Sequence, residues 1–236
     1  MSSYSDDALM KYAHIVAIGK ILFTRSMPSH YQKLEQRMIK KEDILMHLDP
    51  VKRPHLKHVQ GGDRALIASV LLIIHYDYGL PQILLTKRSS GLKSHAGEVC
   101  FPGGRYTQED GELHFTALRE TKEEVGLAFK EKDICGSLKP VRTVTSNYII
   151  TPYVTVQDNI PKPRILSDEV ESILDVPLVD LLTTLASDRL QGYICKDRFI
   201  FKHEGEVIWG ATASIVKQIY DRIFLRCYRS NSKKPS

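Results

Sequence analysis

Three glutamates at helical spacing constrain this chain more than any other feature. Glu120, Glu123 and Glu124 stand at positions i, i+3 and i+4. On a helix such residues share one face, so three carboxylates project from a single turn. Like charges at this spacing repel each other, and only two cations, Arg119 and Lys122, lie among them. Helix stability alone does not favour such an arrangement.

A bound divalent cation resolves this repulsion. Mg²⁺ and Mn²⁺ bind carboxylate oxygens and keep coordination positions for water and phosphate. The alternative interpretation is a solvated acidic face. The context favours the metal, because Gly103 and Gly104 form a turn before the segment and Gly126 is a good C-terminal cap. We therefore predict a helix over residues 110–125 that serves as a metal platform for phosphate chemistry.

The charge distribution divides the 236 residues into a central region and two basic ends. Residues 65–225 carry 18 Lys and Arg against 21 Asp and Glu, residues 1–64 carry 11 against 7, and residues 226–236 carry 4 against none. We expect a partly helical N-terminal extension over 1–64, one α+β domain over 65–225 and a flexible basic tail over 226–236. Because the central domain is not basic, an anionic substrate would need metal ions or a few well-aimed cations.

Apolar runs and turn signals in the central region predict strands that bracket an isolated helix, with a second helix closing the domain. This second helix covers residues 211–227 and carries Ile215, Ile219 and Ile223 on one stripe. The expected strands are residues 65–76, 82–86, 134–144, 148–156, 169–176 and 193–201.

Length and cysteine content exclude several classes of protein. The longest apolar runs, such as residues 65–75, are far shorter than the roughly 18 residues that a membrane span needs. The four cysteines, at positions 100, 135, 195 and 227, contain no CxxC pair, which argues against a zinc or redox motif. We expect reduced thiols and no membrane span.

Targeting signals are weak. Asp6 and Asp7 fall where a presequence avoids acidic residues, and the final Lys234-Pro235-Ser236 does not match the peroxisomal Ser-Lys-Leu signal. We expect an intracellular, cytoplasmic protein, with a mitochondrial location as the alternative.

The acidic segment and its surroundings resemble a known motif. Residues 104–127 resemble the Nudix box. The pattern of this box is Gly, five residues, Glu, seven residues, and then Arg-Glu-aliphatic-x-Glu-Glu-x-Gly-aliphatic. From Arg119 to Leu127 the match fails only at Thr121, which replaces an aliphatic residue. In the first half, Arg119 follows Gly104 by 15 positions where the general pattern has 14. The first acid of the box is left open among Glu109, Asp110 and Glu112.

The stretch that precedes the box is similar to the signature of coenzyme A diphosphatases. That signature reads LLTxRS, three residues, Arg, three residues, Gly, three residues, FPGG. Residues 84–104 match every fixed position except one, where Lys93 replaces Arg. Lysine keeps the charge but loses bidentate phosphate recognition. Together the two motifs cover residues 84–127 without a break.

This resemblance implies an α/β/α sandwich in which a mixed sheet is flanked by the box helix and a C-terminal helix. It also implies an enzyme that uses Mg²⁺ or Mn²⁺ to hydrolyse the diphosphate of coenzyme A or its derivatives, giving 3′,5′-ADP and 4′-phosphopantetheine. The implied metal ligands are Glu120, Glu123, Glu124 and the Gly103 carbonyl, with Glu120 and Glu124 as the catalytic pair. The implied substrate-binding residues are Arg88, Lys93 and Arg119, and Glu169 is a further base or ligand.

Several of these roles have a structural alternative. Arg119 could hold the carboxylates in place instead of contacting phosphate, and Arg88 could form an ion pair with an acid of the box. His95 is a possible donor or proton carrier, or a surface residue. Trp209 resembles a recurrent element of the same branch, which we interpret first as packing and second as an adenine contact.

Two other functions compete with this one. A Nudix hydrolase could act on another nucleoside diphosphate derivative, such as ADP-ribose or NADH, since the box alone serves all of them. A non-catalytic nucleotide-binding module would be favoured by the loss of one of the three glutamates, and none is lost. Nucleic-acid binding through the basic ends ranks third. The expected partner is therefore a small molecule and not a nucleic acid.

Overall fold

The computed structural model describes residues 39–51, 65–144, 146–187 and 199–225. Several expectations lie outside these ranges. They are the structure of residues 1–38 and 52–64 in the N-terminal extension, the basic tail over 226–236, and most of the strand expected over 193–201.

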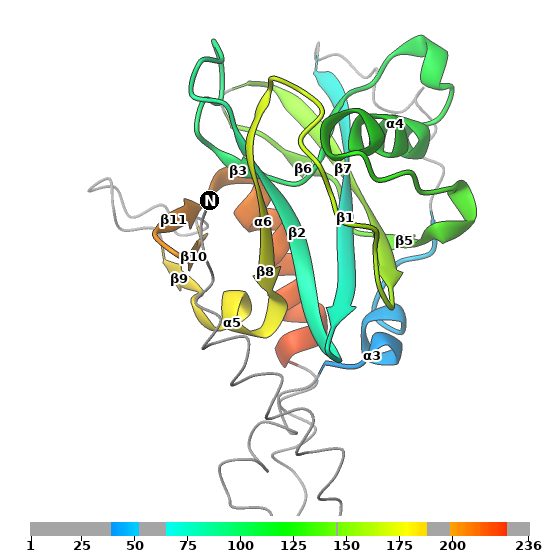
Figure 1. Cartoon of the computed structure of the whole chain (residues 1–236), viewed down its shortest axis with the longest axis vertical. Helices are drawn as coiled ribbons and strands as arrows, with labels where there is room; N and C mark the ends of the chain where they lie inside the picture. Colours follow the sequence, from blue (N-terminus) through cyan, green and yellow to red (C-terminus); the bar gives the residue numbers. More distant parts are fainter. Residues whose placement is uncertain (1–38, 52–64, 145, 188–198, 226–236) are drawn as a thin grey trace, which may run out of the picture.

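The core of the fold is an eight-stranded sheet (Figure 1). Its main path runs β3-β2-β1-β7-β5, while β8 pairs with β2, β4 with β1 and β6 with β7. The β1–β7 pair is parallel and the other described pairs of this sheet are antiparallel. The strands are β1 (Leu66–Asp77), β2 (Leu80–Arg88), β3 (Val99–Cys100), β4 (Gly103–Arg105), β5 (Ile134–Ser137), β6 (Val141–Arg142), β7 (Tyr148–Gln157) and β8 (Val170–Pro177).

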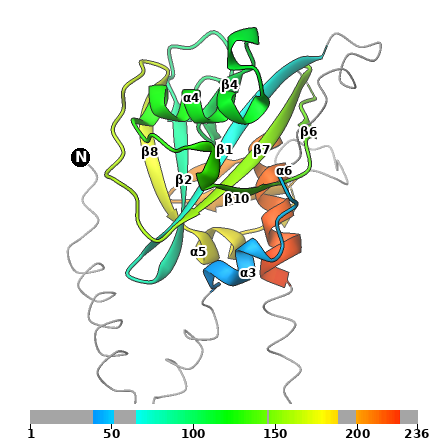
Figure 2. The ribbon, with the colours of Figure 1, turned by 90° about the vertical axis from the view of Figure 1, so that its right-hand side faces the viewer.

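Helices cover both faces of this sheet, which confirms the expected sandwich. The helix α4 (Leu113–Val125) lies on one face, and α6 (Gly210–Ile219) lies on the other (Figure 2). Strand β1 shows why: Leu71 and Ile73 pack in the α4-side core, whereas Leu72 and Ile74 pack in the α6-side core. Side chains alternate along a strand, so a continuous apolar run can serve two cores.

Three elements differ from the sequence-based expectation. The strand expected over 134–144 is divided into β5 and β6, with Pro140 between them, because proline has no N–H to donate to the ladder. Helix α4 begins at Leu113, since Gly111 at φ +71° separates it from the short 3₁₀ turn Gln108–Asp110. The last helix changes to a π-helical turn over Tyr220–Phe224. As expected, Gly126 caps α4 in the left-handed conformation at φ +72°.

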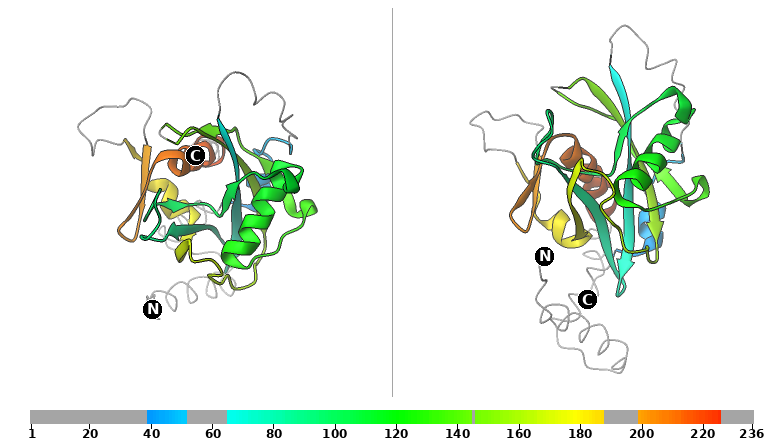
Figure 3. Two further views of the ribbon diagram at one scale, coloured as in Figure 1. Left: turned by 90° about the horizontal axis from the view of Figure 1, so that it is seen from above. Right: turned by 45° about the horizontal axis from the view of Figure 1, so that its top comes forward.

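A second, three-stranded sheet was not predicted. It consists of β9 (Ala186–Ser187), β10 (Phe199–His203) and β11 (Glu206–Ile208), and its β10–β11 hairpin lies on the side of α6 away from α4 (Figure 3). Lys87 of β2 ties the hairpin to the main sheet, because its Nζ lies 2.8 Å from Glu206 Oε1 and 3.6 Å from Glu171 Oε1. Residues 199–201 of the strand expected over 193–201 lie in β10, whereas β9 and β11 are too short to give a clear alternating pattern in the sequence.

Residues 39–51 pack into the α6-side core. They contain the short helix α3 (Lys41–Leu45), and the side chains of Ile39 and Ile44 are 1% and 0% exposed. Asp49 and Ser137 exchange two backbone hydrogen bonds of 3.2 and 3.0 Å, and Asp49 Oδ2 lies 3.0 Å from Arg222. The part of the expected extension that the structure describes is therefore continuous with the main domain.

The packing of this segment gives a stability prediction. Ile44→Ala should lower the free energy of unfolding by about 3 kcal/mol, because it leaves a cavity in a filled core. The matched control is Leu45→Ala, whose side chain is 39% exposed and which should cost less than about 1 kcal/mol. Urea unfolding of the whole chain measures both. Equal, small losses would show that this segment contributes little to the core.

Candidate active site

The candidate site is formed where the glycine strand β4 meets helix α4. Strand β4 pairs with β1, with Gly103 opposite Val70 and Gly104 opposite Ser69. The backbone N–H of Gly103 donates a 3.1 Å hydrogen bond to Glu124 Oε2. A Cβ atom on Gly104 would lie 2.5 Å from both Cδ and Oε1 of Glu120. The two glycines thus allow the backbone to approach both carboxylates.

The close approach at Gly104 gives a second prediction. Gly104→Ala should lower kcat by about 100-fold, because the new methyl group must displace the Glu120 carboxylate from its position. Gly91→Ala is the control, since its Cβ would come no nearer than 4.0 Å to the closest side-chain atom outside its neighbours. Steady-state kinetics on any substrate that the wild-type protein cleaves makes the measurement. Wild-type kcat in Gly104→Ala would contradict the role of this contact.

Burial gives the acids of α4 unequal environments. Glu124 is 6% exposed, and burial raises its pKa to about 7, with Glu120 adding repulsion and the Gly103 N–H opposing the shift. Burial also raises the pKa of Glu120, and the nearby Arg119 opposes that shift. The side chain of Glu123 is 56% exposed. A buried carboxylate beside two others is a poor arrangement for stability and a suitable one for binding a cation.

Arg119 contacts three carboxylates. Its Nε and Nη2 donate to Asp110 at 2.7 and 3.0 Å, and its Nη1 lies 2.9 Å from Glu120 Oε1 and 3.0 Å from Glu123 Oε2. The bidentate pair with Asp110 identifies which of the three candidate acids faces the arginine. These contacts support the interpretation that Arg119 holds the carboxylates in place.

Asp110 is itself tightly held. Its side chain is 4% exposed, and it accepts hydrogen bonds from the Thr116 hydroxyl at 2.8 Å and from the Thr107 N–H at 3.2 Å. The Arg119 guanidinium is the main reason that the pKa of Asp110 is lowered to about 2. Sequence reasoning did not find the threonines, because the box pattern has no fixed residue at either position.

Arg88 and Glu169 lie together on neighbouring strand ends. Arg88 Nη2 donates a 3.1 Å hydrogen bond to Glu169 Oε2, and the Ser89 N–H donates to the Glu169 carbonyl at 2.8 Å. Strands β2 and β8 pair antiparallel up to Arg88, which brings these distant residues together. Arg88 therefore forms an ion pair, although with Glu169 and not with an acid of the box.

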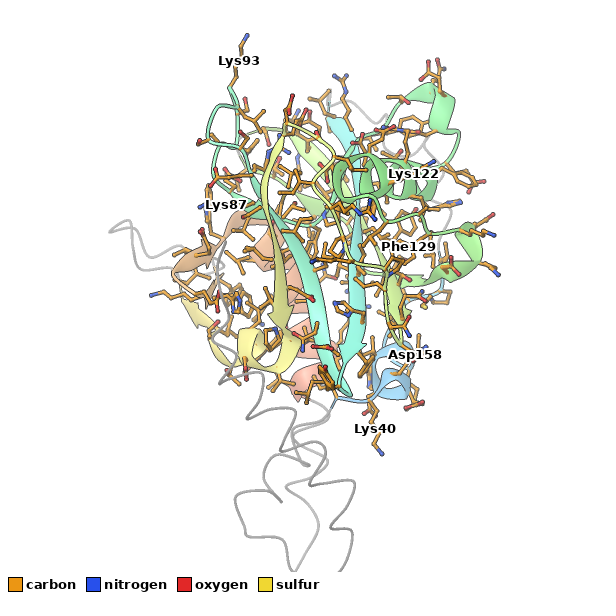
Figure 4. The ribbon with its side chains drawn as sticks, in the orientation of Figure 1. Lys40, Lys87, Lys93, Lys122, Phe129 and Asp158 are labelled. Carbon is orange, nitrogen blue, oxygen red and sulfur yellow. The ribbon has the colours of Figure 1, made fainter. Side chains whose placement is uncertain are left out.

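The other site residues expected from the sequence lie in the loop between β2 and β3 and at the start of α6. Lys93 is exposed at the tip of the loop between β2 and β3 and points away from the domain (Figure 4). In the same loop, His95 Nδ1 lies 2.9 Å from Glu98 Oε1. Trp209 precedes α6 as its N-cap, and it is 49% exposed, so packing alone does not account for it.

The donor set fits a hard divalent cation by its chemistry. Glu120, Glu123 and Glu124 offer carboxylate oxygens from one helix, and two of these acids have raised pKa values that a cation would lower. Within the described ranges, no three His, Cys, Asp or Glu side chains have already converged as a metal centre. The same carboxylates are instead engaged by Arg119 and by the Gly103 N–H.

The sequence of this chain is similar to those of known proteins. A model of the NUDIX domain matches residues 66–193, more than half of the chain. "Nudix hydrolase 3" from Caenorhabditis elegans is 32% identical over 201 residues, 75% of this chain and 82% of that protein. "Uncharacterized Nudix hydrolase NudL" from Yersinia enterocolitica is 34% identical over 147 residues, 61% of this chain and 74% of the relative. A MutT/nudix family protein from Enterococcus faecalis superposes with a TM-score of 0.49 and 14% identity, over 86% of this chain and 75% of that one.

The family model and the relatives identify a hydrolase of the class that acts on nucleoside diphosphate derivatives. More particularly, this chain belongs to the Nudix family, whose enzymes generally use divalent metal ions. Among the residues that the structure describes, no helix is long and apolar enough to cross a membrane.

Proposed function

We propose that this enzyme hydrolyses the diphosphate bridge of coenzyme A or its derivatives to 3′,5′-ADP and 4′-phosphopantetheine. The observation that carries the proposal is the diphosphatase-like stretch over residues 84–104, which ends in the two glycines beside Glu120 and Glu124. The segment that resembles a substrate signature and the acids that do the chemistry are therefore parts of one continuous structure.

The proposed chemistry assigns separate tasks to the acids and the cations. When bound, Mg²⁺ or Mn²⁺ would be held by Glu120, Glu123, Glu124 and the Gly103 carbonyl, and would neutralise the diphosphate and acidify water. Glu120 orients the attacking water and accepts its proton. Glu124, which is buried, is the second catalytic residue beside it. Glu169 is a further base or ligand, held by Arg88 at 3.1 Å.

Positive charge is needed to bind the anionic substrate. Arg88, Lys93 and Arg119 are the proposed substrate-binding residues. Arg119 acts mainly by fixing Glu120 and Glu123, since both lie within 3.0 Å of its Nη1. Lys93 lies on an exposed loop, where it can meet an incoming phosphate.

Comparison of substrates tests the proposal. With Mg²⁺ or Mn²⁺ present, kcat/KM for coenzyme A should exceed that for ADP-ribose and NADH by at least about tenfold. A preference for ADP-ribose or NADH would leave the hydrolase intact but show that the substrate is a different one. Binding of coenzyme A without turnover of any substrate would favour a non-catalytic module.

A further inference from the structure

The loop between β7 and β8, residues 158–169, is fastened to the C-terminal end of helix α4 (Figure 2). The N–H of Leu166 donates a 2.9 Å hydrogen bond to the Glu124 carbonyl, and the N–H of Arg164 donates one of 3.0 Å to the Val125 carbonyl. The last carbonyls of a helix have no partner within the helix, and this loop supplies partners for two of them. The position of the loop is therefore set by the end of the helix that carries Glu124.

The same loop ends at Glu169, three residues after Leu166. The Glu169 N–H donates a 3.2 Å hydrogen bond to the Ser167 hydroxyl oxygen, and the Val170 N–H donates one of 3.1 Å to the Ser167 carbonyl. On the other side, the Ser89 N–H donates to the Glu169 carbonyl at 2.8 Å. The backbone of Glu169 is thus held by β2 on one side and, through Ser167, by the loop that is bound to α4.

The side chain of Glu169 lies close to the acids of α4. Burial is the main cause of the raised pKa of Glu124, and Glu169 adds repulsion that Arg88 opposes. The Glu169 side chain is 57% exposed, and its ion pair with Arg88 is a single hydrogen bond of 3.1 Å. An exposed side chain retains much rotational freedom, so its carboxylate reaches one fixed point only if the backbone beneath it is held.

We propose that Ser167 is a positioning residue, whose hydroxyl holds the Glu169 backbone at the distance from Glu124 that the hydrogen bonds between the loop and α4 set. This inference rests on the proposed function, in which Glu169 is a further base or ligand. Helix α4 carries three of the acids and the loop carries the fourth, and the loop is bonded to the end of that helix. Turnover should therefore depend on the Ser167 hydroxyl only through Glu169.

A double-mutant cycle tests whether Ser167 acts through Glu169. On any substrate that the wild-type protein cleaves, Ser167→Ala should lower kcat by about tenfold, because the Glu169 N–H loses its acceptor. Glu169→Gln should itself lose at least as much, and in that background Ser167→Ala should cost less than about twofold. Ser167→Thr keeps the hydroxyl and should retain at least about half of the wild-type kcat.

Ser214→Ala is the matched control. Ser214 lies on α6, across the sheet from α4, and its hydroxyl donates a 2.9 Å hydrogen bond to the Gly210 carbonyl, so its removal should leave kcat unchanged. An equal loss from Ser167→Ala in both backgrounds would overturn the inference and leave the role of Glu169 intact. Wild-type kcat in Glu169→Gln would overturn the proposed role of Glu169 and the inference with it. Neither result depends on whether the substrate is coenzyme A.

Discussion

Glu124→Gln should abolish most turnover and at the same time stabilise the metal-free protein at pH 8. Activity should fall by about 100-fold or more, because the variant loses a charged ligand of the proposed cation. The stability gain follows from the environment of Glu124, a 6% exposed carboxylate whose pKa burial raises from 4.5 to about 7. Ionisation of the Glu124 carboxylate is less favourable in the folded chain than in the unfolded chain, so it lowers the free energy of unfolding.

The pH dependence fixes the sign of this effect. A raised pKa means that the folded chain binds the Glu124 proton more tightly, so the contribution of Glu124 to stability is highest below about pH 4.5 and falls as the pH rises to about 7. The loss is about 3 kcal/mol at about 1.4 kcal/mol per pKa unit. With a chelator present, the stability of Glu124→Gln should not decline in this way. The variant should therefore be more stable than the wild type at pH 8 and equally stable at pH 4.5.

Urea unfolding over this pH range makes the measurement, and Glu123→Gln is the control. The Glu123 side chain is 56% exposed, so its replacement should give no comparable gain in stability. A Glu124→Gln variant that is inactive and also less stable at pH 8 would contradict the assignment, since it would indicate a structural carboxylate.

Asp110→Asn should destabilise the protein by about 3 kcal/mol at pH 7, because it removes the charged partner of Arg119 from a largely buried pair. The Asp110 carboxylate is 4% exposed and meets the guanidinium at 2.7 and 3.0 Å. Turnover should also fall by about tenfold, since Arg119 would no longer hold Glu120 and Glu123 in one arrangement.

Acid pH distinguishes this ion pair from simple packing. Because Arg119 lowers the pKa of Asp110 from 3.8 to about 2, the pair stabilises the fold above about pH 4, and this contribution is lost as the pH falls toward 2. The stability difference between the wild type and Asp110→Asn should therefore shrink as the pH falls from about 4 to about 2. Asp77→Asn, an exposed acid at the end of β1, is the control. A difference that stays constant with pH would contradict the electrostatic explanation.

Sequence reasoning predicted the elements that have strong periodic patterns. The continuous apolar run of β1, the acidic helix α4 with Gly126 as its cap, and the stripe of α6 are local signals, and the structure contains each of them. Segment 39–51 was not recognised as part of the core, because a five-residue helix such as α3 shows too little periodicity.

The residues of the candidate site likewise divide into those that local spacing predicts and those that it does not. The spacing of Glu120, Glu123 and Glu124 is visible in the sequence, but the partner of Arg119 is not. Gly111 ends the preceding turn at φ +71°, and only this local geometry decides that Asp110 reaches the guanidinium. The Arg88–Glu169 pair depends on the register of β2 against β8, which joins residues 81 positions apart. Long-range pairing of this kind leaves no pattern in a single sequence.

Mass spectrometry of the reaction products tests the central proposal most directly. The wild-type protein and Glu124→Gln would each be incubated with coenzyme A and Mg²⁺ or Mn²⁺, and with a chelator as the metal-free control. We expect 3′,5′-ADP and 4′-phosphopantetheine in equal amounts from the wild type with metal, and neither product from the variant or from the chelated enzyme. Intact coenzyme A in every sample, while ADP-ribose or NADH is cleaved under the same conditions, would contradict the assigned substrate.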